Sequence, residues 1–186
     1  MLIGLLCISG NAACNEVRSQ YVSLQEKSCK KLSGFLNQHY ISRDLVAIEC
    51  PANVTVQSVP LRLFIVSSEG RSWIDLALGD TIWSSEDEVV SEKENQFGYF
   101  PNIGNTPAEI RINQTQTTGL IVRITAQNPE PRSSNLGASN TSRLFVFGFR
   151  DSGVCLIDLV RDNKMARDLL DSGVDCKRIL KAKHLQ

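Results

Sequence analysis

The stretch Leu61-Arg-Leu-Phe-Ile-Val-Ser-Ser-Glu-Gly-Arg-Ser-Trp-Ile-Asp-Leu-Ala-Leu78 decides the fold of this chain. Its two ends, Leu61–Val66 and Ser72–Leu78, are rich in the β-branched and aromatic residues that favour strands. Between them, Ser67-Ser-Glu-Gly70 is a short connection in which Gly70 can take the positive φ of a tight turn. The stretch therefore predicts an antiparallel β-hairpin.

A second hairpin and further short strands repeat this pattern along the chain. Arg143–Phe149 and Val154–Leu159 flank the turn sequence Arg150-Asp-Ser-Gly153. More segments of this kind lie between turn signals: Leu45–Ile48, Val54–Val56, Ala108–Ile112 and Leu120–Ala126. We therefore expect a mainly β fold, a single antiparallel β-sandwich or barrel-like domain, with an α+β arrangement as the alternative.

One α-helix is predicted close to the C-terminus, over about 162–172. The apolar residues between Met165 and Leu170 fall on one helical face, and Gly173 is placed to end the helix. This helix leads directly into Cys176.

The first residues, Met1–Cys14, predict a secretory signal peptide. The apolar run Leu2–Ile8 is shorter than the roughly 20 residues that span a bilayer, and small residues follow it, although no Lys or Arg precedes it. The expected division is a signal peptide over 1–13 and a single mainly β domain over 14–186. A buried N-terminal strand is the alternative.

The cysteines support export and predict disulfides. Removal of the leader also removes Cys7 and leaves an odd number of cysteines. Cys29 and Cys50 are separated by the same number of residues as Cys155 and Cys176. Sequential pairing, Cys29 with Cys50 and Cys155 with Cys176, is the simplest of three connectivities, and each bridge would contribute about 3 kcal/mol. Zinc is not expected, because zinc ligands usually come in closely spaced pairs.

Cys14 is then left without a partner. It is a possible lipidation site, although Asn11 stands where lipoprotein signals carry an aliphatic residue. The alternative is a free or intermolecularly paired thiol. The protein is thus expected to be periplasmic or secreted, with membrane attachment only if Cys14 is lipidated.

Charge argues against several classes of partner. Lys plus Arg and Asp plus Glu both number 20, so the net charge is zero and nucleic acid is not an expected partner. The basic residues at 177–184 are interpreted as a solvated tail. The acidic residues between Glu86 and Glu94 lack the alternating ligands and mid-loop glycine of a calcium loop, so we expect neither metal nor cofactor.

Catalytic signals are scarce. Of the two histidines, His184 lies in the basic tail and His39 in a polar connection, and both are interpreted as solvated. No nucleophile elbow, phosphate-binding glycine loop or paired-histidine motif occurs. An envelope hydrolase using carboxylates such as Asp75 or Asp80 is the alternative function, and it requires those carboxylates to converge in a pocket.

The segment Phe97-Gly-Tyr-Phe-Pro-Asn-Ile-Gly-Asn105 concentrates aromatic residues among turn formers. Rigid aromatics on such a segment can form a stacking surface for sugars or peptides. The candidate binding residues are Arg71, Trp73, Phe97, Tyr99, Phe100, Asn102 and Asn105. The alternative is that Phe97 and Phe100 plug the end of the sheet while Tyr99 caps an edge.

Short motifs spread along the chain support a resemblance. They are Tyr21-Val-Ser-Leu24, Cys29-Lys30, Glu49-Cys50-Pro51, Glu69-Gly-Arg-Ser72, Phe97-Gly98 through Gly104, Cys155, and Ala166-Arg167 before Cys176. In this order the chain resembles a group of exported proteobacterial proteins with disulfide-type cysteines and no assigned activity. It departs from the group at Pro51-Ala-Asn53, where the group carries a glycine-rich segment. The resemblance implies a periplasmic or secreted domain and supplies no catalytic residues.

Together these observations predict a non-enzymatic envelope protein that binds a peptide, a glycan or a protein partner. A structural lipoprotein is a further alternative, which depends on Cys14.

Overall fold

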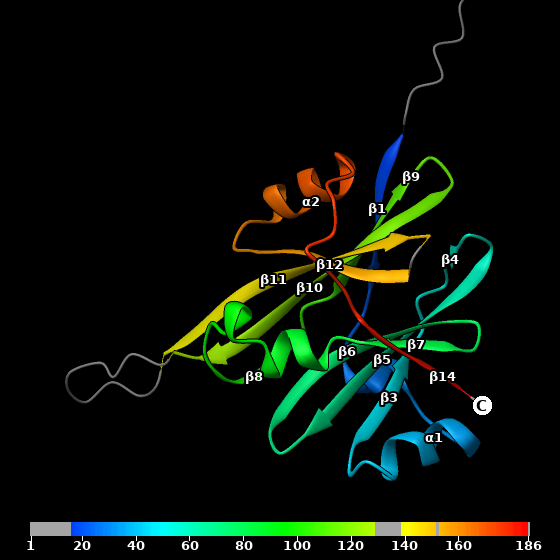
Figure 1. Ribbon diagram of the computed structural model, residues 1–186, viewed down its shortest axis with the longest axis vertical. Helices are drawn as coiled ribbons and strands as arrows, with labels where there is room; N and C mark the ends of the chain where they lie inside the picture. Colours follow the sequence, from blue (N-terminus) through cyan, green and yellow to red (C-terminus); the bar gives the residue numbers. More distant parts are fainter. Residues whose placement is uncertain (1–15, 129–138, 152, 186) are drawn as a thin grey trace, which may run out of the picture.

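The computed structural model describes residues 16–128, 139–151 and 153–185. The expected signal peptide and Cys14 lie outside the described residues. Strands account for 53% and helices for 18% of the described residues, so the expectation of a mainly β fold with a C-terminal helix is confirmed. The strands form two antiparallel sheets that are not closed into a barrel (Figure 1), which rules out the barrel-like form.

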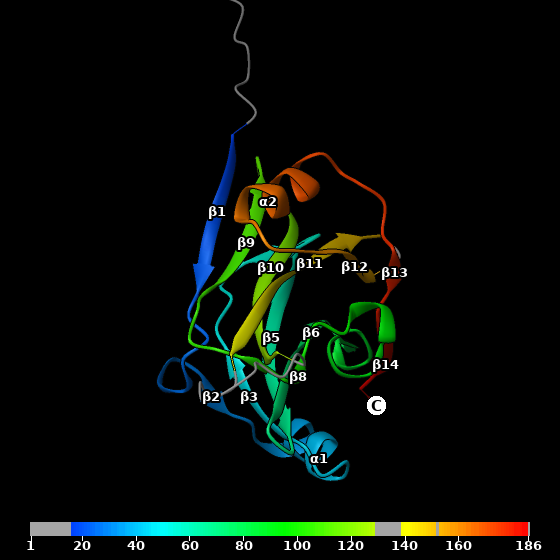
Figure 2. The ribbon, with the colours of Figure 1, turned by 90° about the vertical axis from the view of Figure 1, so that its left-hand side faces the viewer.

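The first sheet has the strand order β1-β9-β10-β11-β12-β13, with β8 also paired to β10. Its strands are β1 (Val17–Val22), β8 (Tyr99–Ile103), β9 (Ala108–Asn113), β10 (Gln116–Gln127), β11 (Asn140–Arg150), β12 (Gly153–Val160) and β13 (Arg178–Ile179). Figure 2 shows β1 along one side of the molecule, with α2 packed near it.

The second sheet has the order β14-β7-β6-β5-β3-β2, with β4 paired to β5. Its strands are β2 (Lys30–Lys31), β3 (Val46–Cys50), β4 (Thr55–Val56), β5 (Val59–Ser68), β6 (Arg71–Leu78), β7 (Thr81–Ser84) and β14 (Lys181–His184). The basic C-terminal segment therefore forms β13 and an edge strand, β14, and its interpretation as a solvated tail was wrong.

Both predicted hairpins are present. In the first, Ser68 pairs with Arg71, so the turn is the two residues Glu69 and Gly70 rather than the four expected. Both have positive φ, 48° and 76°, which matches the twist of the flanking strands. In the second hairpin Arg150 pairs with Gly153.

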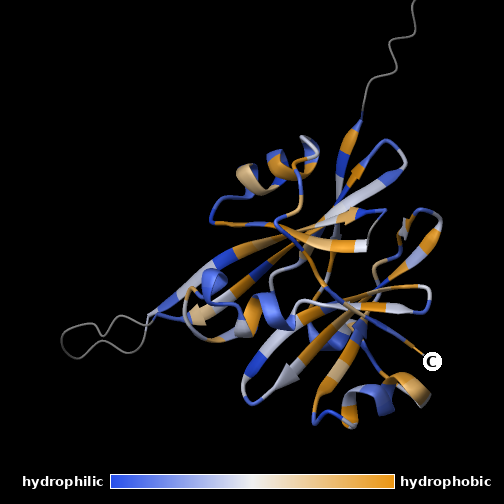
Figure 3. Ribbon diagram, in the orientation of Figure 1, coloured by the Kyte–Doolittle hydropathy of each residue, from blue (hydrophilic) through white to orange (hydrophobic). Residues whose placement is uncertain are grey.

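The core lies between the two sheets and joins them in one cluster of buried side chains. Apolar residues, drawn in orange, recur along the central strands (Figure 3). All six residues from Ser72 to Ala77 in β6 are buried, so both faces of this strand are covered. Burial of both faces explains why the segment is almost continuously apolar instead of alternating.

Two α-helices cover the sheets. The predicted C-terminal helix is α2 (Asn163–Asp171), and the Asp162 carboxylate caps it by accepting a hydrogen bond from the Met165 N–H. The other helix, α1 (Gly34–Ile41), was not predicted. Only Tyr40 of α1 is buried, so the sequence offers no apolar stripe to reveal this helix. Short helical turns lie at Glu26–Ser28 (η1), Asp87–Ser91 (η2) and Lys93–Asn95 (η3).

The predicted disulfides are both confirmed. Cys29 bonds to Cys50, which ties the turn before β2 to the end of β3. Cys155 bonds to Cys176, which ties the segment after α2 back to β12. Two disulfides indicate an oxidising environment outside the cytoplasm.

Candidate functional site

The strand register brings a carboxylate, a hydroxyl and two lysines onto one face of the second sheet. Residues directly opposite each other on neighbouring strands share a face. Asp75 of β6 lies opposite Ser84 of β7, and Ser84 lies opposite Lys181 of β14. Two residues further along these strands, in the next row of residues on the same face, Ile82 lies opposite Lys183. Tyr40, near the end of α1, reaches this face and contacts Asp75 through its hydroxyl.

Asp75 is buried in the middle of this face, with 1% of its surface exposed. The Ser84 hydroxyl donates to Asp75 Oδ1 at 2.6 Å, and the Tyr40 hydroxyl donates to Oδ2 at 3.2 Å. Burial raises the pKa of Asp75 to about 6, although the two hydroxyl hydrogen bonds favour the ionised form. Burial and the Asp75 charge also raise the pKa of Tyr40, so its hydroxyl keeps its proton and remains a donor.

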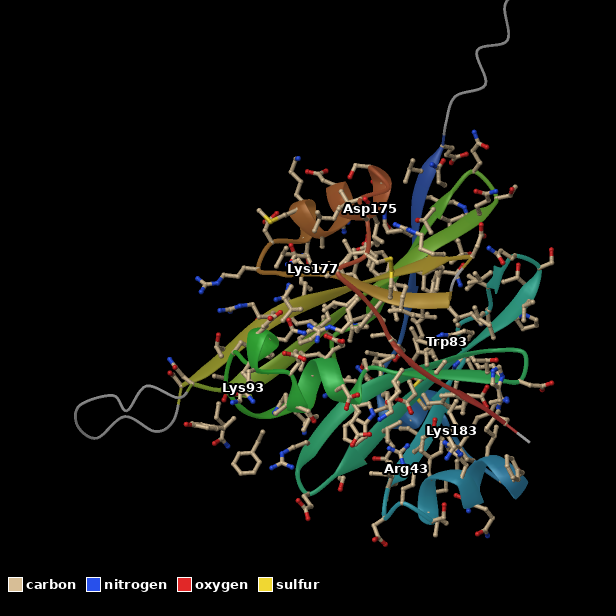
Figure 4. The ribbon with its side chains drawn as sticks, in the orientation of Figure 1. Arg43, Trp83, Lys93, Asp175, Lys177 and Lys183 are labelled. Atoms are coloured by element: carbon tan, nitrogen blue, oxygen red, sulfur yellow. A yellow bond between two sulfur atoms is a disulfide. The ribbon has the colours of Figure 1, made fainter. Side chains whose placement is uncertain are left out.

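Asp75 lines a cavity of about 390 Å³ between α1, β7 and β14, which we call the Asp75 cavity. Its rim carries His39, Arg43 and Lys183, and Figure 4 shows Arg43 and Lys183 on the same side of the molecule, next to α1. Arg43 is paired with Glu86 at 2.8 Å. Burial, Lys183 and Arg43 lower the pKa of His39, so this imidazole is neutral at physiological pH.

Asp80, the other carboxylate of the hydrolase hypothesis, does not join Asp75. It lies beside the β6–β7 turn, where its carbonyl accepts a hydrogen bond from the Leu185 N–H, and it is not among the residues that line the Asp75 cavity. Glu86 and Asp87 do line the cavity, but Arg43 pairs with Glu86, and Lys181 lies 4.0 Å from Asp87. Asp75 is the buried carboxylate of this group.

The predicted aromatic segment is partly exposed. Tyr99 and Phe100 on β8 have 61% and 50% of their surfaces exposed. The Arg71 guanidinium lies over the Phe100 ring, 5.8 Å from its centroid. We call Arg71, Tyr99 and Phe100 the aromatic patch. Phe100 has a φ of 48°, a conformation that is strained for a bulky side chain.

Hydrogen bonds hold the aromatic patch on the strand beneath it. The Ser72 hydroxyl donates to Asn102 Oδ1 at 3.0 Å and accepts from the Ile103 N–H at 2.7 Å. The Asn102 amide donates to the Gly70 carbonyl at 3.3 Å. Asn102 therefore positions β8 against the first hairpin. Asn105 is exposed beyond the end of β8.

Two predicted binding residues belong to the core instead. Trp73 is 2% exposed, so it cannot contribute to a surface platform. Burial of both faces of β6 leaves no exposed position there for this ring. Phe97 packs against the core next to Phe145, 5.9 Å between ring centroids, while the Arg143 guanidinium lies 5.7 Å from its centroid.

The acidic segment 86–94 forms ion pairs with the C-terminal strand. Arg178 of β13 lies 3.2 Å from buried Glu88 and 2.5 Å from Glu92. Burial raises the pKa of Glu88. Within residues 16–128, 139–151 and 153–185, no cluster of His, Cys, Asp or Glu side chains is arranged to hold a metal ion.

A third buried carboxylate, Glu109 of β9, lies under α2. Arg167 of α2 binds it through two hydrogen bonds of 2.6 and 2.9 Å, and Arg111 lies 3.7 Å away. The Ser19 hydroxyl also donates to Glu109. Burial alone would raise the pKa of Glu109, but these donors and charges lower it overall. Arg111 in turn pairs with Asp171, so this network fixes α2 on the first sheet.

A larger hollow, about 640 Å³, lies elsewhere, beside the Cys50 end of β3. The charged side chains at its centre already form an ion pair, because Arg62 donates two hydrogen bonds to Glu49, each of 2.7 Å. The Gln20 amide likewise donates to the Ala52 carbonyl. Size alone therefore does not make this hollow the candidate site.

Comparisons with known proteins assign no family. No family model matches the chain, no curated protein matches its sequence, and no solved structure matches its fold. None of the helices in the described parts of the chain is long and apolar enough to cross a membrane.

Sequence reasoning found Asp75 but not the groups around it. Tyr40, Ser84 and Lys183 come from separate segments that only the sheet register and α1 bring together. The visible signal was an Asp in the middle of an otherwise apolar strand, Trp73-Ile-Asp-Leu76, because an interior carboxylate requires partners.

Proposed function

We propose that this chain is a non-enzymatic binding domain that works outside the cytoplasm and captures a peptide or protein partner through the aromatic patch. The observation that carries this proposal is the exposure of the adjacent residues Tyr99 and Phe100, with Arg71 over the Phe100 ring and Phe100 held in a strained backbone conformation. Strain that persists at an exposed aromatic is typical of functional surfaces, where it presents a side chain in a fixed direction.

The chemistry of the patch favours a peptide or protein over a glycan. Glycan binding needs several free planar hydrogen-bonding groups around the aromatic ring. Here the Asn102 amide is engaged by Gly70 and Ser72, and the cation over the Phe100 ring is Arg71, which lies 3.7 Å from the exposed Glu69 carboxylate. Tyr, Arg and exposed aromatic area are the groups that dominate protein interfaces. An apolar side chain next to a carboxylate would match Phe100 and Arg71.

Within this proposal, the protein works in the periplasm or in the extracellular medium. The two disulfides support it, together with the expected signal peptide over 1–13 and the resemblance to exported proteobacterial proteins. Intact-mass analysis of the exported protein tests the N-terminus. An unmodified chain starting near Cys14 indicates a soluble protein, an acylated Cys14 indicates a membrane-anchored lipoprotein, and retention of 1–12 contradicts export by cleavage.

Photocrosslinking in cells that export the protein tests the aromatic patch. A benzophenone amino acid replaces Tyr99 in one variant and Phe35 of α1, an equally exposed aromatic, in a control variant. We expect a discrete crosslinked protein or peptide from position 99 only, and its loss when Arg71→Ala and Phe100→Ala are added.

The same experiment can contradict the proposal. Equal crosslinking from both positions, or none from either, argues against the patch as a binding surface. A crosslinked species that disappears on glycosidase treatment identifies a glycan partner instead of a peptide or protein. Thermal unfolding of the Arg71→Ala, Phe100→Ala variant must remain close to that of the wild type, since a large loss of stability returns these residues to a packing role.

A further inference from the structure

The Asp75 cavity contains a buried carboxylate without a cation. Buried charges in proteins are normally paired, because removal of a carboxylate from water is costly. Within the described parts of the chain Asp75 has no ion pair, and its hydrogen bonds come from the neutral hydroxyls of Ser84 and Tyr40. Glu88 and Glu109, the other buried carboxylates, each have an arginine within 3.2 Å. A cationic group is therefore the missing partner of Asp75.

The rim of the same cavity has the opposite charge. Lys183 lines the cavity and forms no ion pair with any described residue, whereas Lys181 and Arg43 have Asp87 and Glu86 beside them. Lys183 and Arg43 both lie close enough to His39 to lower its pKa. The rim therefore offers a site for an anionic group, in the same cavity as a carboxylate that has no ion pair.

We propose that the Asp75 cavity binds a free zwitterionic α-amino acid, with the ligand ammonium on Asp75 and the ligand carboxylate on Lys183. Lys183 lies two residues along the strands and two strands across the sheet from Asp75, about 7 Å and about 10 Å at the backbone. The long Lys183 side chain lines the cavity and shortens this gap, so an amino-acid backbone can contact Lys183 through its carboxylate and Asp75 through its ammonium. This site uses different residues from the aromatic patch and does not depend on the proposed partner.

The cavity has room for such a ligand and a place for its side chain. Its volume of about 390 Å³ is in the range of small-molecule sites. A neighbouring hollow of about 430 Å³ is lined by the same His39 and Lys183, together with Phe35 of α1. Phe35 is exposed there, so an apolar or aromatic ligand side chain would lie against it.

Calorimetric titration with a matched ligand series tests this inference. The probes are L-phenylalanine, 3-phenylpropionate, which lacks the ammonium, and phenethylamine, which lacks the carboxylate. We expect L-phenylalanine to bind and each single-charge analogue to bind at least about tenfold more weakly, because each loses one charge-assisted contact. Equal binding of an analogue, or no binding of L-phenylalanine at millimolar concentration, overturns the proposal.

Matched variants locate the site. Asp75→Asn and Lys183→Gln should each weaken L-phenylalanine binding by about tenfold or more. The controls Asp80→Asn and Lys177→Gln, outside the cavity, should leave it unchanged. Lys183 is exposed, so its variant keeps the test valid even where Asp75→Asn alters folding. Undiminished binding by both cavity variants contradicts the assignment.

Discussion

The two α-helices cover buried carboxylates of opposite character. Under α2, Glu109 is surrounded by Arg167, Arg111 and Ser19, and its pKa is lowered. Under α1, Asp75 has only hydroxyl donors, and burial raises its pKa to about 6. Both groups are removed from water, but only Glu109 forms ion pairs within the described parts of the chain, whereas Arg43 favours the ionised form of Asp75 without pairing with it. The difference separates a carboxylate that holds the fold together from one that lowers its stability and is available to a ligand.

The largest effect is expected where the compensated carboxylate is lost. Glu109→Gln leaves Arg167 and Arg111 without their shared anion in a nearly buried position, so the free energy of unfolding should fall by about 3–5 kcal/mol. Urea denaturation at pH 7.5 measures it. Glu69→Gln, on the exposed hairpin turn, is the control and should change stability by less than about 0.5 kcal/mol. If Glu109→Gln lowered the free energy of unfolding by no more than the control does, the ion pairs around Glu109 would contribute little to stability.

Asp75→Asn should raise the free energy of unfolding at pH 7.5, whereas Glu109→Gln lowers it. The ordinary pKa of an aspartate, 3.8, applies in the unfolded chain, and burial raises the pKa of Asp75 to about 6 in the folded protein. Between these values the folded state holds the additional proton, so stability falls as the pH rises from about 4 to about 6 and stays lower above that. In the wild type the difference between these two pKa values lowers the free energy of unfolding by about 3 kcal/mol above pH 6. Asp75→Asn cannot ionise at this position, so the variant should be more stable than the wild type at pH 7.5.

The pH dependence of that difference provides the control. At pH 4 Asp75 is protonated in the folded protein, so urea denaturation should give nearly equal stabilities for wild type and Asp75→Asn. Asp80→Asn should show no such divergence between the two pH values. If Asp75→Asn is less stable than the wild type at pH 7.5, the carboxylate is compensated after all and the contrast with Glu109 fails.

A smaller change in stability is expected when the tyrosines of the two sites, Tyr40 and Tyr21, lose their hydroxyl groups. Tyr40 is buried and donates to Asp75, whereas Tyr21 is 59% exposed and accepts from Arg167. Tyr40→Phe should destabilise the protein by about 1–2 kcal/mol at pH 7.5, because the ionised carboxylate loses a donor. Tyr21→Phe should cost less than about 0.5 kcal/mol. Equal effects in thermal unfolding would argue against the Tyr40–Asp75 hydrogen bond as a determinant of stability.

Much of the fold follows from local sequence patterns, and most of the site does not. The hairpin around Glu69-Gly70 and the helix capped by Asp162 are encoded by neighbouring residues, so they could be predicted. Edge strand β14 could not, because its residues, Lys181–His184, are all exposed and carry no alternation. Trp73 was misplaced because sequence does not reveal that both faces of β6 are covered.

The same limit applies to the Asp75 cavity. Its floor and rim come from α1, β6, β7 and β14, which are far apart in the chain. An interior Asp signals a polar site, but the absence of a compensating cation is a property of the assembled structure. It becomes visible only when the register places Ser84 instead of an arginine opposite Asp75.

The most direct test of the central contrast is an NMR pH titration of the side-chain carboxyl carbons of Asp75 and Glu109 in one labelled sample. We expect a midpoint of about 6 for Asp75, because burial raises its pKa, and a midpoint below the ordinary glutamate value of about 4.3 for Glu109. A midpoint below about 4 for Asp75 would show that its charge is compensated in the folded protein, and would contradict the account.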